Sequence, residues 1–224
     1  PGTIVIKGSL NYPYELPTSA SVGDGYIIAT LALTMGWRVK VYSMAGPEKL
    51  STTETRTAYQ NYQQAGGVIV PFSNHACIDA DLVVDALIGS GLNRPVCDLY
   101  GDAIDTINAQ NLPIISVDAP SGLNTDTGGI WGKAVKANRT VSFIVLKQGL
   151  FTGLAPEYCG EIVYANLDTS TQWSDQIPSS AQLLSRQVFP IRHRCSHKGQ
   201  CGHTLIIGGA IGYSGAVRLA GEAA

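Results

Sequence analysis

The sequence predicts an α/β protein whose mostly parallel sheet is covered by helices on both faces. Short apolar runs of strand length alternate with longer segments of helical apolar spacing from residue 3 to residue 165. The runs at 82–87 and 114–117 are almost continuously apolar, which is typical of strands buried on both faces. Strands that alternate with helices also imply right-handed crossover connections, and therefore a parallel sheet.

Each expected element follows from its own local pattern. We expect strands at 3–6, 38–42, 68–70, 82–87, 114–117, 140–146 and 161–165, and helices at 24–35, 52–65 and 99–108. The first helix ends at Gly36, a suitable C-cap, and the second is closed by the pair Gly66-Gly67. Pro113 follows the third helix and leads into the strand at 114–117.

Changes in amino-acid composition divide the chain into three parts. Residues 1–168 form the first domain, and residues 169–189, rich in Ser, Gln and Thr with Pro178 inside, are a predicted linker. Residues 190–224 begin a second α/β domain with a strand at 204–207, a Gly-rich turn at 208–215 and an Ala-rich helix. A strand, Gly-rich turn and helix N-terminus is an arrangement that binds phosphate, but so short a segment cannot form a core. Both ends look cut, so we expect a fragment of a longer protein.

Composition narrows the possible functions. Charged residues make up only 14% of the chain, the net charge is −2 and no basic stripe is present, which disfavours nucleic acid as a ligand. No apolar stretch approaches the roughly 18 residues of a membrane span, and no leader precedes the first strand. Five widely spaced cysteines suit reduced thiols. We therefore expect a cytoplasmic protein that binds neither nucleic acid nor membrane.

Two acids stand where the fourth and fifth expected strands end. Asp85 is followed by the turn 89–91, and Asp118 by the turn Pro120-Ser121-Gly122. Open parallel sheets place their ligand crevice at the carboxyl ends of the strands, so the two carboxylates can meet in one crevice. Such a pair raises one pKa or recruits a cation held by oxygen ligands, with Ser121 as a further ligand. The alternative is that each acid merely begins its own turn.

Weaker signals surround this pair. The segment 8–25 joins the first strand to a helix that begins at Asp24, whose N-terminus suits an anion. Lys147 follows a strand and either pairs with a phosphate or the acids or is simply solvated. Three histidines and two cysteines within 193–203 suggest zinc, but their spacing matches no common structural zinc site.

Taken together, three motifs resemble the NAD(P)H-hydrate epimerase domain. They are Val84-Asp85-Ala86-Leu87-Ile88-Gly89-Ser90-Gly91-Leu92, Ser116-Val117-Asp118-Ala119-Pro120-Ser121-Gly122-Leu123 and Phe143-Ile144-Val145-Leu146-Lys147-Gln148-Gly149-Leu150. The later motifs Ser196-His197-Lys198-Gly199, Leu205-Ile206-Ile207-Gly208-Gly209 and Ser214-Gly215-Ala216 resemble the opening of the ADP/ATP-dependent NAD(P)H-hydrate dehydratase. This order is that of the bifunctional nicotinamide-nucleotide repair enzymes, and it accounts for His197 without zinc.

The resemblance implies a Rossmann-like three-layer αβα sandwich that interconverts the R and S forms of NADHX and NADPHX, the hydrated reduced cofactors. It implies that Asp118 is the acid/base residue and that Asp85, Ser121 and Asn11 bind a potassium ion. The implied substrate-binding residues are Asn11, Gly23, Asp24, Gly89, Ser90, Gly91, Leu92, Asn93, Arg94, Pro95, Asp118 and Lys147. ADP or ATP would serve only the incomplete dehydratase part. A homo-oligomer is a further expectation.

One segment departs from the family pattern, Gly-x-Gly-Asn-Asn-Gly-Gly-Asp-Gly. Gly8 and Gly23-Asp24-Gly25 match it, but a dozen residues intervene, the Asn-Asn pair is absent and Asn11 is the remaining candidate ligand. This departure motivates an alternative function, a non-catalytic binding or adaptor module of the same fold. An ordinary NAD-dependent dehydrogenase is disfavoured, because Gly-x-Gly-x-x-Gly does not follow the first strand directly.

Overall fold

The computed structural model describes residues 3–8, 21–44, 46–50, 52–73, 78–167, 181–184, 194–197, 199 and 202–224, with side chains from residue 23 onward. The chain separates into two compact units, Pro1–Ala181 and Gln182–Ala224. The division falls inside the predicted linker, and the predicted domain limits at 168 and 190 stay predictions. Asn11 lies outside the described residues.

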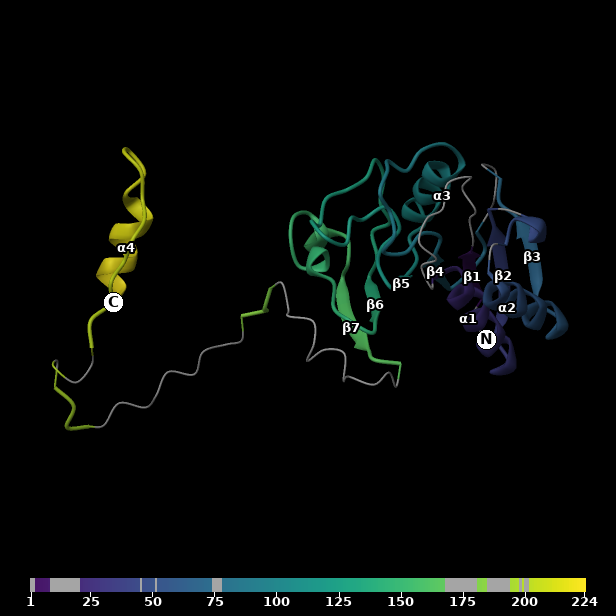
Figure 1. Ribbon diagram of the computed structural model, residues 1–224, viewed down its shortest axis with the longest axis horizontal. Helices are drawn as coiled ribbons and strands as arrows, with labels where there is room; N and C mark the ends of the chain where they lie inside the picture. The colour runs from purple at the N-terminus through teal and green to yellow at the C-terminus, as the bar shows by residue number, and fades with distance from the viewer. Residues whose placement is uncertain are drawn as a thin grey trace. The chain divides into compact units, whose positions relative to one another are not determined.

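The first unit contains a parallel sheet of seven strands in the order β3-β2-β1-β4-β5-β6-β7 (Figure 1). Its strands are β1 (Thr3–Gly8), β2 (Arg38–Ser43), β3 (Val68–Pro71), β4 (Leu82–Ala86), β5 (Ile114–Val117), β6 (Arg139–Phe143) and β7 (Glu161–Ala165). The helices are α1 (Ser21–Thr34), α2 (Thr53–Gln64) and α3 (Asp98–Asn108), with short 3₁₀ helices η1 (Pro47–Lys49), η2 (Gln148–Leu150) and η3 (Ala155–Glu157). The predicted fold class is confirmed.

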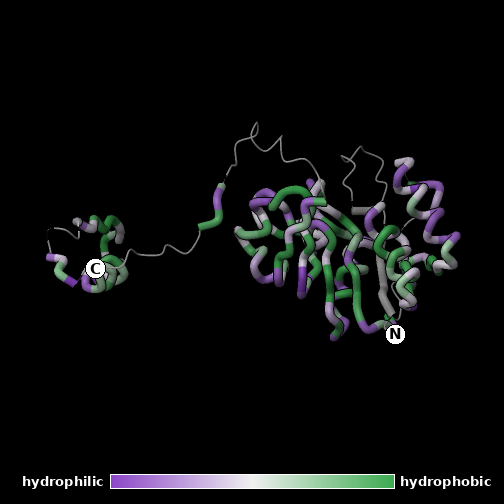
Figure 2. The backbone as a smooth tube through the Cα atoms, turned by 90° about the horizontal axis from the view of Figure 1, so that it is seen from below, coloured by the Kyte–Doolittle hydropathy of each residue, from purple (hydrophilic) through white to green (hydrophobic). Residues whose placement is uncertain are grey.

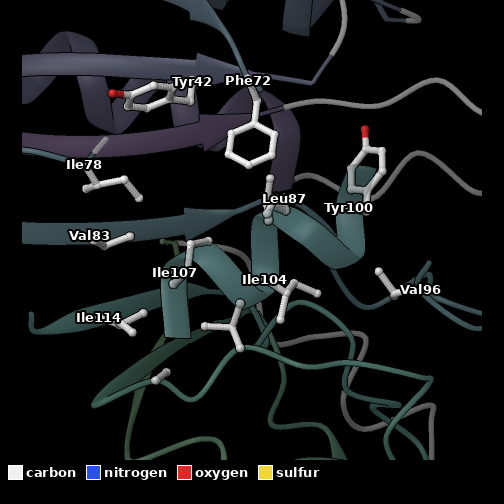
Figure 3. Packing of buried hydrophobic residues seen from close by; sticks show 13 residues of the cluster. Tyr42, Phe72, Ile78, Val83, Leu87, Val96, Tyr100, Ile104, Ile107 and Ile114 are labelled. Atoms are coloured by element: carbon white, nitrogen blue, oxygen red, sulfur yellow. The ribbon is translucent and has the colours of Figure 1, made fainter. Parts of the chain in front are cut away.

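Neighbouring residues of β4 show that the sheet is covered on both faces. Val83 packs in a cluster with Ile104 and Ile107 of α3, which Figure 3 shows from close by. Val84 packs in a separate cluster with Tyr26 of α1 and with α2. Because successive strand residues point to opposite faces, the two clusters are the two cores of an αβα sandwich. Figure 2 shows hydrophobic and hydrophilic stretches interspersed along the backbone of this unit.

Two strand predictions were wrong. The expected strand at 140–146 ends at Phe143, because Ile144 adopts φ 64°, a left-handed conformation that turns the chain out of the sheet. The expected strand at 204–207 is not formed in the described part of the second unit, where Leu205 and Ile207 are exposed. A strand needs a neighbour for its backbone hydrogen bonds, and no described segment supplies one there. The expected helix forms as α4 (Gly215–Ala223).

In the described residues, no helix has both the length and the apolar character needed to cross a membrane.

Candidate active site

The candidate site lies where the strand order reverses. Strand β1 is flanked by β2 on one side and β4 on the other, so the chain runs in opposite directions across the sheet from this point. The carboxyl ends of the strands at such a switch point form the ligand crevice of open α/β folds. Asp85 on β4, Asp118 just after β5 and Asp24 in the first turn of α1 all lie around this edge.

Asp85 is fully buried, and its carboxylate is surrounded by hydrogen-bond donors. Its Oδ1 accepts from the Ser121 hydroxyl at 2.6 Å and the Leu87 amide at 3.3 Å. Its Oδ2 accepts from the Ser116 hydroxyl at 2.8 Å and the Ser121 amide at 2.9 Å. Burial raises the pKa of Asp85, and these hydrogen bonds act in the opposite direction. Asp85 therefore fastens the turn after β5 to the end of β4.

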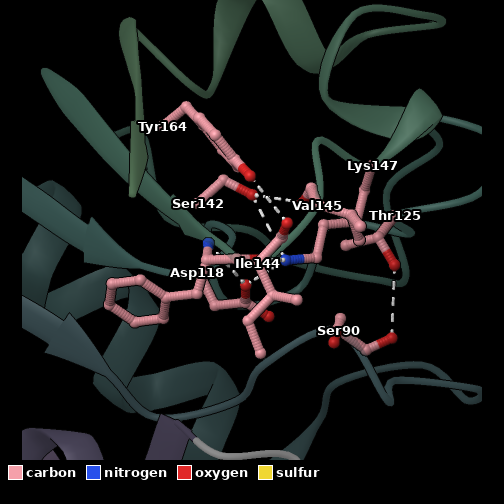
Figure 4. Close-up of polar contacts among 9 residues, drawn as sticks. Ser90, Asp118, Thr125, Ser142, Ile144, Val145, Lys147 and Tyr164 are labelled. Atoms are coloured by element: carbon pink, nitrogen blue, oxygen red, sulfur yellow. Dashed lines mark hydrogen bonds and ion pairs between the residues drawn. The ribbon is translucent and has the colours of Figure 1, made fainter. Parts of the chain in front are cut away.

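Ser121 extends this connection to the loop that follows β4. Its hydroxyl oxygen accepts a hydrogen bond from the Ile88 amide at 2.9 Å. Farther along, the Thr125 hydroxyl donates to the Ser90 carbonyl at 3.2 Å (Figure 4). Ser121 and Thr125 thus hold the start of the predicted substrate loop 89–95, through Ile88 just before it and Ser90 within it. Within the loop, Gly89 is buried while Asn93 and Pro95 are exposed.

Asp118 stands just past the end of β5 in a different environment. Its φ of 68° lies in the left-handed region, which Asp tolerates better than most residues. Its amide donates to the Val141 carbonyl at 2.7 Å, so hydrogen bonding to β6 continues to this residue. Its Oδ1 accepts from the Phe143 amide at 3.4 Å and forms an ion pair with Lys147 (Figure 4). The side chain remains 11% exposed, so it retains access to solvent.

Lys147, the partner of Asp118, follows a turn whose backbone is strained. Its ammonium group also donates to the Phe143 carbonyl at 2.9 Å and to the Ser142 hydroxyl at 3.2 Å. The intervening Ile144 is β-branched yet has φ 64°, a conformation that costs on the order of 1–3 kcal/mol. Tyr164 supports this turn through a 2.8 Å hydrogen bond to the Ile144 carbonyl (Figure 4). Of the two partners predicted for Lys147, the structure shows the acid.

The third acid, Asp24, is coupled to Asp118. Burial and the charge of Asp118, in that order, raise the pKa of Asp24 from 3.8 to about 6. Its Oδ2 is buried and accepts no hydrogen bond from the described residues. A Cβ added at Gly23, the preceding residue, would lie 3.5 Å from the Thr55 hydroxyl oxygen. The acid on which the charge of Asp118 acts is therefore Asp24. Asp85, the expected partner of Asp118, instead holds the turn, and Asp118 is not among the causes that shift its pKa.

The predicted potassium ligands fit a cation in chemistry and charge. Carboxylate and hydroxyl oxygens are ligands for hard cations, and in the described residues no cationic side chain pairs with the buried Asp85. All four lone-pair positions of Asp85 already face donors, so an ion there would take the place of hydroxyl hydrogens that can rotate away. Ser116 was not among the predicted residues. Its signal in the sequence was a polar residue within a buried strand.

Three comparisons place the chain among known proteins. The family model described as YjeF-related protein N-terminus matches residues 19–149, more than half of the chain. The "Bifunctional NAD(P)H-hydrate repair enzyme Nnr" of Coxiella burnetii is 41% identical over 207 residues, covering 90% of this chain and 42% of the relative. The protein of the same name from Escherichia coli is 37% identical, covering 90% of this chain and 40% of the relative. This chain therefore spans about two fifths of the length of such relatives.

A solved structure supports the fold. The crystal structure of yeast ynu0 matches with a TM-score of 0.53 and 17% identity, covering 66% of this chain and 59% of the yeast chain. The likeness supports the α/β fold of this chain. The sheet order and the acids at its edge agree with this fold. Because the family model matches residues 19–149, this chain belongs to the YjeF-related protein N-terminus family.

Proposed function

We propose that this chain is an epimerase that interconverts the R and S forms of hydrated NADH and NADPH. The single observation that supports this most is Asp118, a carboxylate held at the crevice edge by a left-handed backbone and an ion pair with Lys147. The names of the relatives point to the same substrates and favour an enzyme over a non-catalytic module.

The chemistry requires a group that moves a proton. In the hydrated cofactor a hydroxyl sits on the carbon next to the ring nitrogen, whose lone pair can expel it. An acid protonates the departing hydroxyl, an iminium forms, and water returns on the other face while a base takes its proton. A positioned acid/base residue typically accelerates such a step by about 10²- to 10⁴-fold.

The contacts that hold the Asp118 side chain suit it to this role. Lys147 and the Phe143 amide hold one carboxyl oxygen, Oδ1. Oδ2 is then the oxygen of Asp118 available to face the reacting carbinol. Because the Lys147 ammonium group already has three acceptors, we propose that it positions Asp118. Its predicted contact with the substrate stays a prediction.

The test is a coupled assay. Pure R-NADHX is incubated with this protein and a separate dehydratase specific for the S form, and NADH is measured. We expect NADH to appear well above the spontaneous rate, and Asp118→Asn to remove that acceleration. An unaccelerated wild type would refute the activity, and a fully active Asp118→Asn variant would remove Asp118 from the mechanism.

We also propose a potassium ion held by Asp85 and Ser121, with Asn11 as a further ligand. A monovalent cation would neutralise the buried carboxylate and hold the loops around it. Raising potassium from zero to 100 mM at constant ionic strength, with N-methylglucamine as the replacement, should raise the Tm of wild type but not of Asp85→Asn. Equal Tm values for wild type in both salts would exclude the ion.

The whole protein, we propose, is also a dehydratase of the S form that uses ADP or ATP. The motifs at 196–199, 205–209 and 214–216 support this proposal. The described part of residues 182–224 holds the single helix α4 and no described strand, so we expect no dehydratase activity from this chain alone. Incubating it with S-NADHX and ATP and measuring NADH tests this.

A further inference from the structure

The carboxyl group of Asp24 has an environment that suits a proton donor. It lies in the first turn of α1, at the edge of the sheet where β4 and β5 end. One of its oxygens is buried, and no described residue donates a hydrogen bond to it. Asp118, by contrast, forms an ion pair with Lys147 and accepts a hydrogen bond from the Phe143 amide. A carboxyl oxygen that is buried without a donor favours the protonated form of the group.

The charge of Asp118 acts on Asp24. The pKa of Asp24 is raised to about 6 by burial first and by the charge of Asp118 second. Charged residues on the elements packed against α1 are Lys7 on β1, Arg38 and Lys40 on β2, Glu54 and Arg56 on α2, Asp85 on β4, and Asp118 after β5 with its partner Lys147. The charge that acts on Asp24 is that of Asp118. Asp24 has an oxygen without a donor among the described residues, and Asp118 is paired with a cation. Two neighbouring carboxyls in different surroundings are the usual arrangement of an acid and base pair.

The proposed reaction needs two proton-handling groups. Epimerisation by loss and return of water breaks a C–O bond on one face of the ring and forms a C–O bond on the opposite face. A single carboxyl fixed on one face can protonate the leaving hydroxyl there. The incoming water on the other face then needs a separate base.

We propose that Asp24 is the second catalytic residue of this site and works on the face of the ring opposite Asp118. This inference rests on the proposed epimerase function. In one direction Asp24 gives its proton to the departing hydroxyl, the ring nitrogen lone pair forms the iminium, and water leaves. Water then adds on the other face, its oxygen pair forms the new C–O bond, and Asp118 takes its proton. The end state, Asp24 ionised and Asp118 protonated, is the starting state for the reverse direction.

The test compares Asp24→Asn with wild type and with Asp126→Asn. Asp126 is an exposed acid of the same domain, so its variant controls for the loss of one carboxylate. We expect Asp24→Asn to lower kcat by about 100-fold or more, with KM changed by less than about threefold, and Asp126→Asn to behave as wild type. Asp24→Glu should recover part of kcat. A wild-type fall of kcat/KM above about pH 6 should be absent in Asp24→Asn.

A second measurement is independent of activity. Carbon-13 NMR of labelled aspartate carboxyls should show Asp24 titrating near pH 6 in wild type and at lower pH in Asp118→Asn. Ordinary titration near pH 4 in wild type would overturn the pairing. An active wild type with an equally active Asp24→Asn would overturn only the role of Asp24. A wild type without activity would overturn the proposed function together with that role.

Discussion

Asp85 and Asp118 arise from the same local pattern, an acid at the end of a buried parallel strand, yet they occupy opposite environments. Asp85 lies inside β4 directly beside Ser116 of β5, and accepts hydrogen bonds only from neutral hydroxyl and amide groups. Asp118 lies two residues farther along β5, about 6–7 Å nearer the edge, and pairs with an ammonium group. Two residues of register therefore separate an acid that holds the turn from an acid that keeps some exposure at the edge of the sheet.

Removing the carboxylate of Asp85 should have the largest effect on stability. Asp85→Ala leaves two hydroxyls and two amides in the interior without their acceptor, so we expect a loss of about 4 kcal/mol in the free energy of unfolding. Urea unfolding checks this, and Asp126→Ala, at an exposed position, should change it by less than about 0.5 kcal/mol. A loss as small as that of the control would show that Asp85 does not hold the turn.

Breaking the ion pair at Asp118 should have an intermediate effect. Lys147→Met leaves a largely buried carboxylate without its cation, and we expect a loss of about 2 kcal/mol. In an Asp118→Asn background the same substitution should cost less, because the uncompensated charge is gone. A double-mutant cycle from denaturant unfolding measures this coupling. Strictly additive losses would mean that the pair contributes nothing.

The sequence could predict where Asp85 and Asp118 lie in the fold, but not which residues would surround them. The alternation of helices and strands predicted the sheet, and the acids at 85 and 118 were placed correctly at its edge. The pattern could not show that Asp85 would be enclosed, since that depends on the register that sets Ser116 beside it. Nor could it couple Asp24 to Asp118, because they lie 94 positions apart and meet only when α1 packs against the sheet.

The turn between β6 and Lys147 was missed for a different reason. The run Thr140 to Leu146 has strand propensity throughout, but Ile144 adopts a left-handed conformation. One local and one tertiary contact hold it there: the Lys147 ammonium group donates to the Phe143 carbonyl, and the Tyr164 hydroxyl on β7 donates to the Ile144 carbonyl. Local preference was overridden where the site is built, which is where stored backbone strain commonly occurs.

Removing one donor from Asp85 should have a smaller effect than removing Asp85 itself. Ser116→Ala eliminates the 2.8 Å hydrogen bond to Oδ2, while Oδ2 keeps the Ser121 amide. We expect a loss of about 1–2 kcal/mol, the usual value for one hydrogen bond to a charged group. Thermal unfolding checks this, with Ser90→Ala as control, because the Ser90 contact uses its backbone carbonyl. A loss as large as that of Asp85→Ala would place most of the turn's stability on one hydroxyl.

The smallest effect, and one of opposite sign, is expected at Asp24. Its pKa is raised from 3.8 in the unfolded chain to about 6 in the folded chain, so the folded state binds the extra proton between these values. Stability therefore falls as pH rises from about 4 to 6, and the full penalty persists above 6. Asp24→Asn should remove it, stabilising the protein by about 1 kcal/mol at pH 8 once solvent screening of this half-buried group is allowed for.

At pH 3.5 the carboxyl is largely protonated in both states, so the gain from Asp24→Asn should nearly vanish. Urea unfolding of wild type and variant at the two pH values measures the difference. An equal gain in unfolding free energy at both pH values would mean that Asp24→Asn stabilises the protein through packing. A gain confined to pH 8 would mean that the ionised Asp24 carboxylate destabilises the folded protein. Asp85, which is also buried, accepts hydrogen bonds from four donors, and we expect its removal to destabilise the fold. Asp24 would do the reverse, as expected of a side chain retained for its proton and not for its contacts.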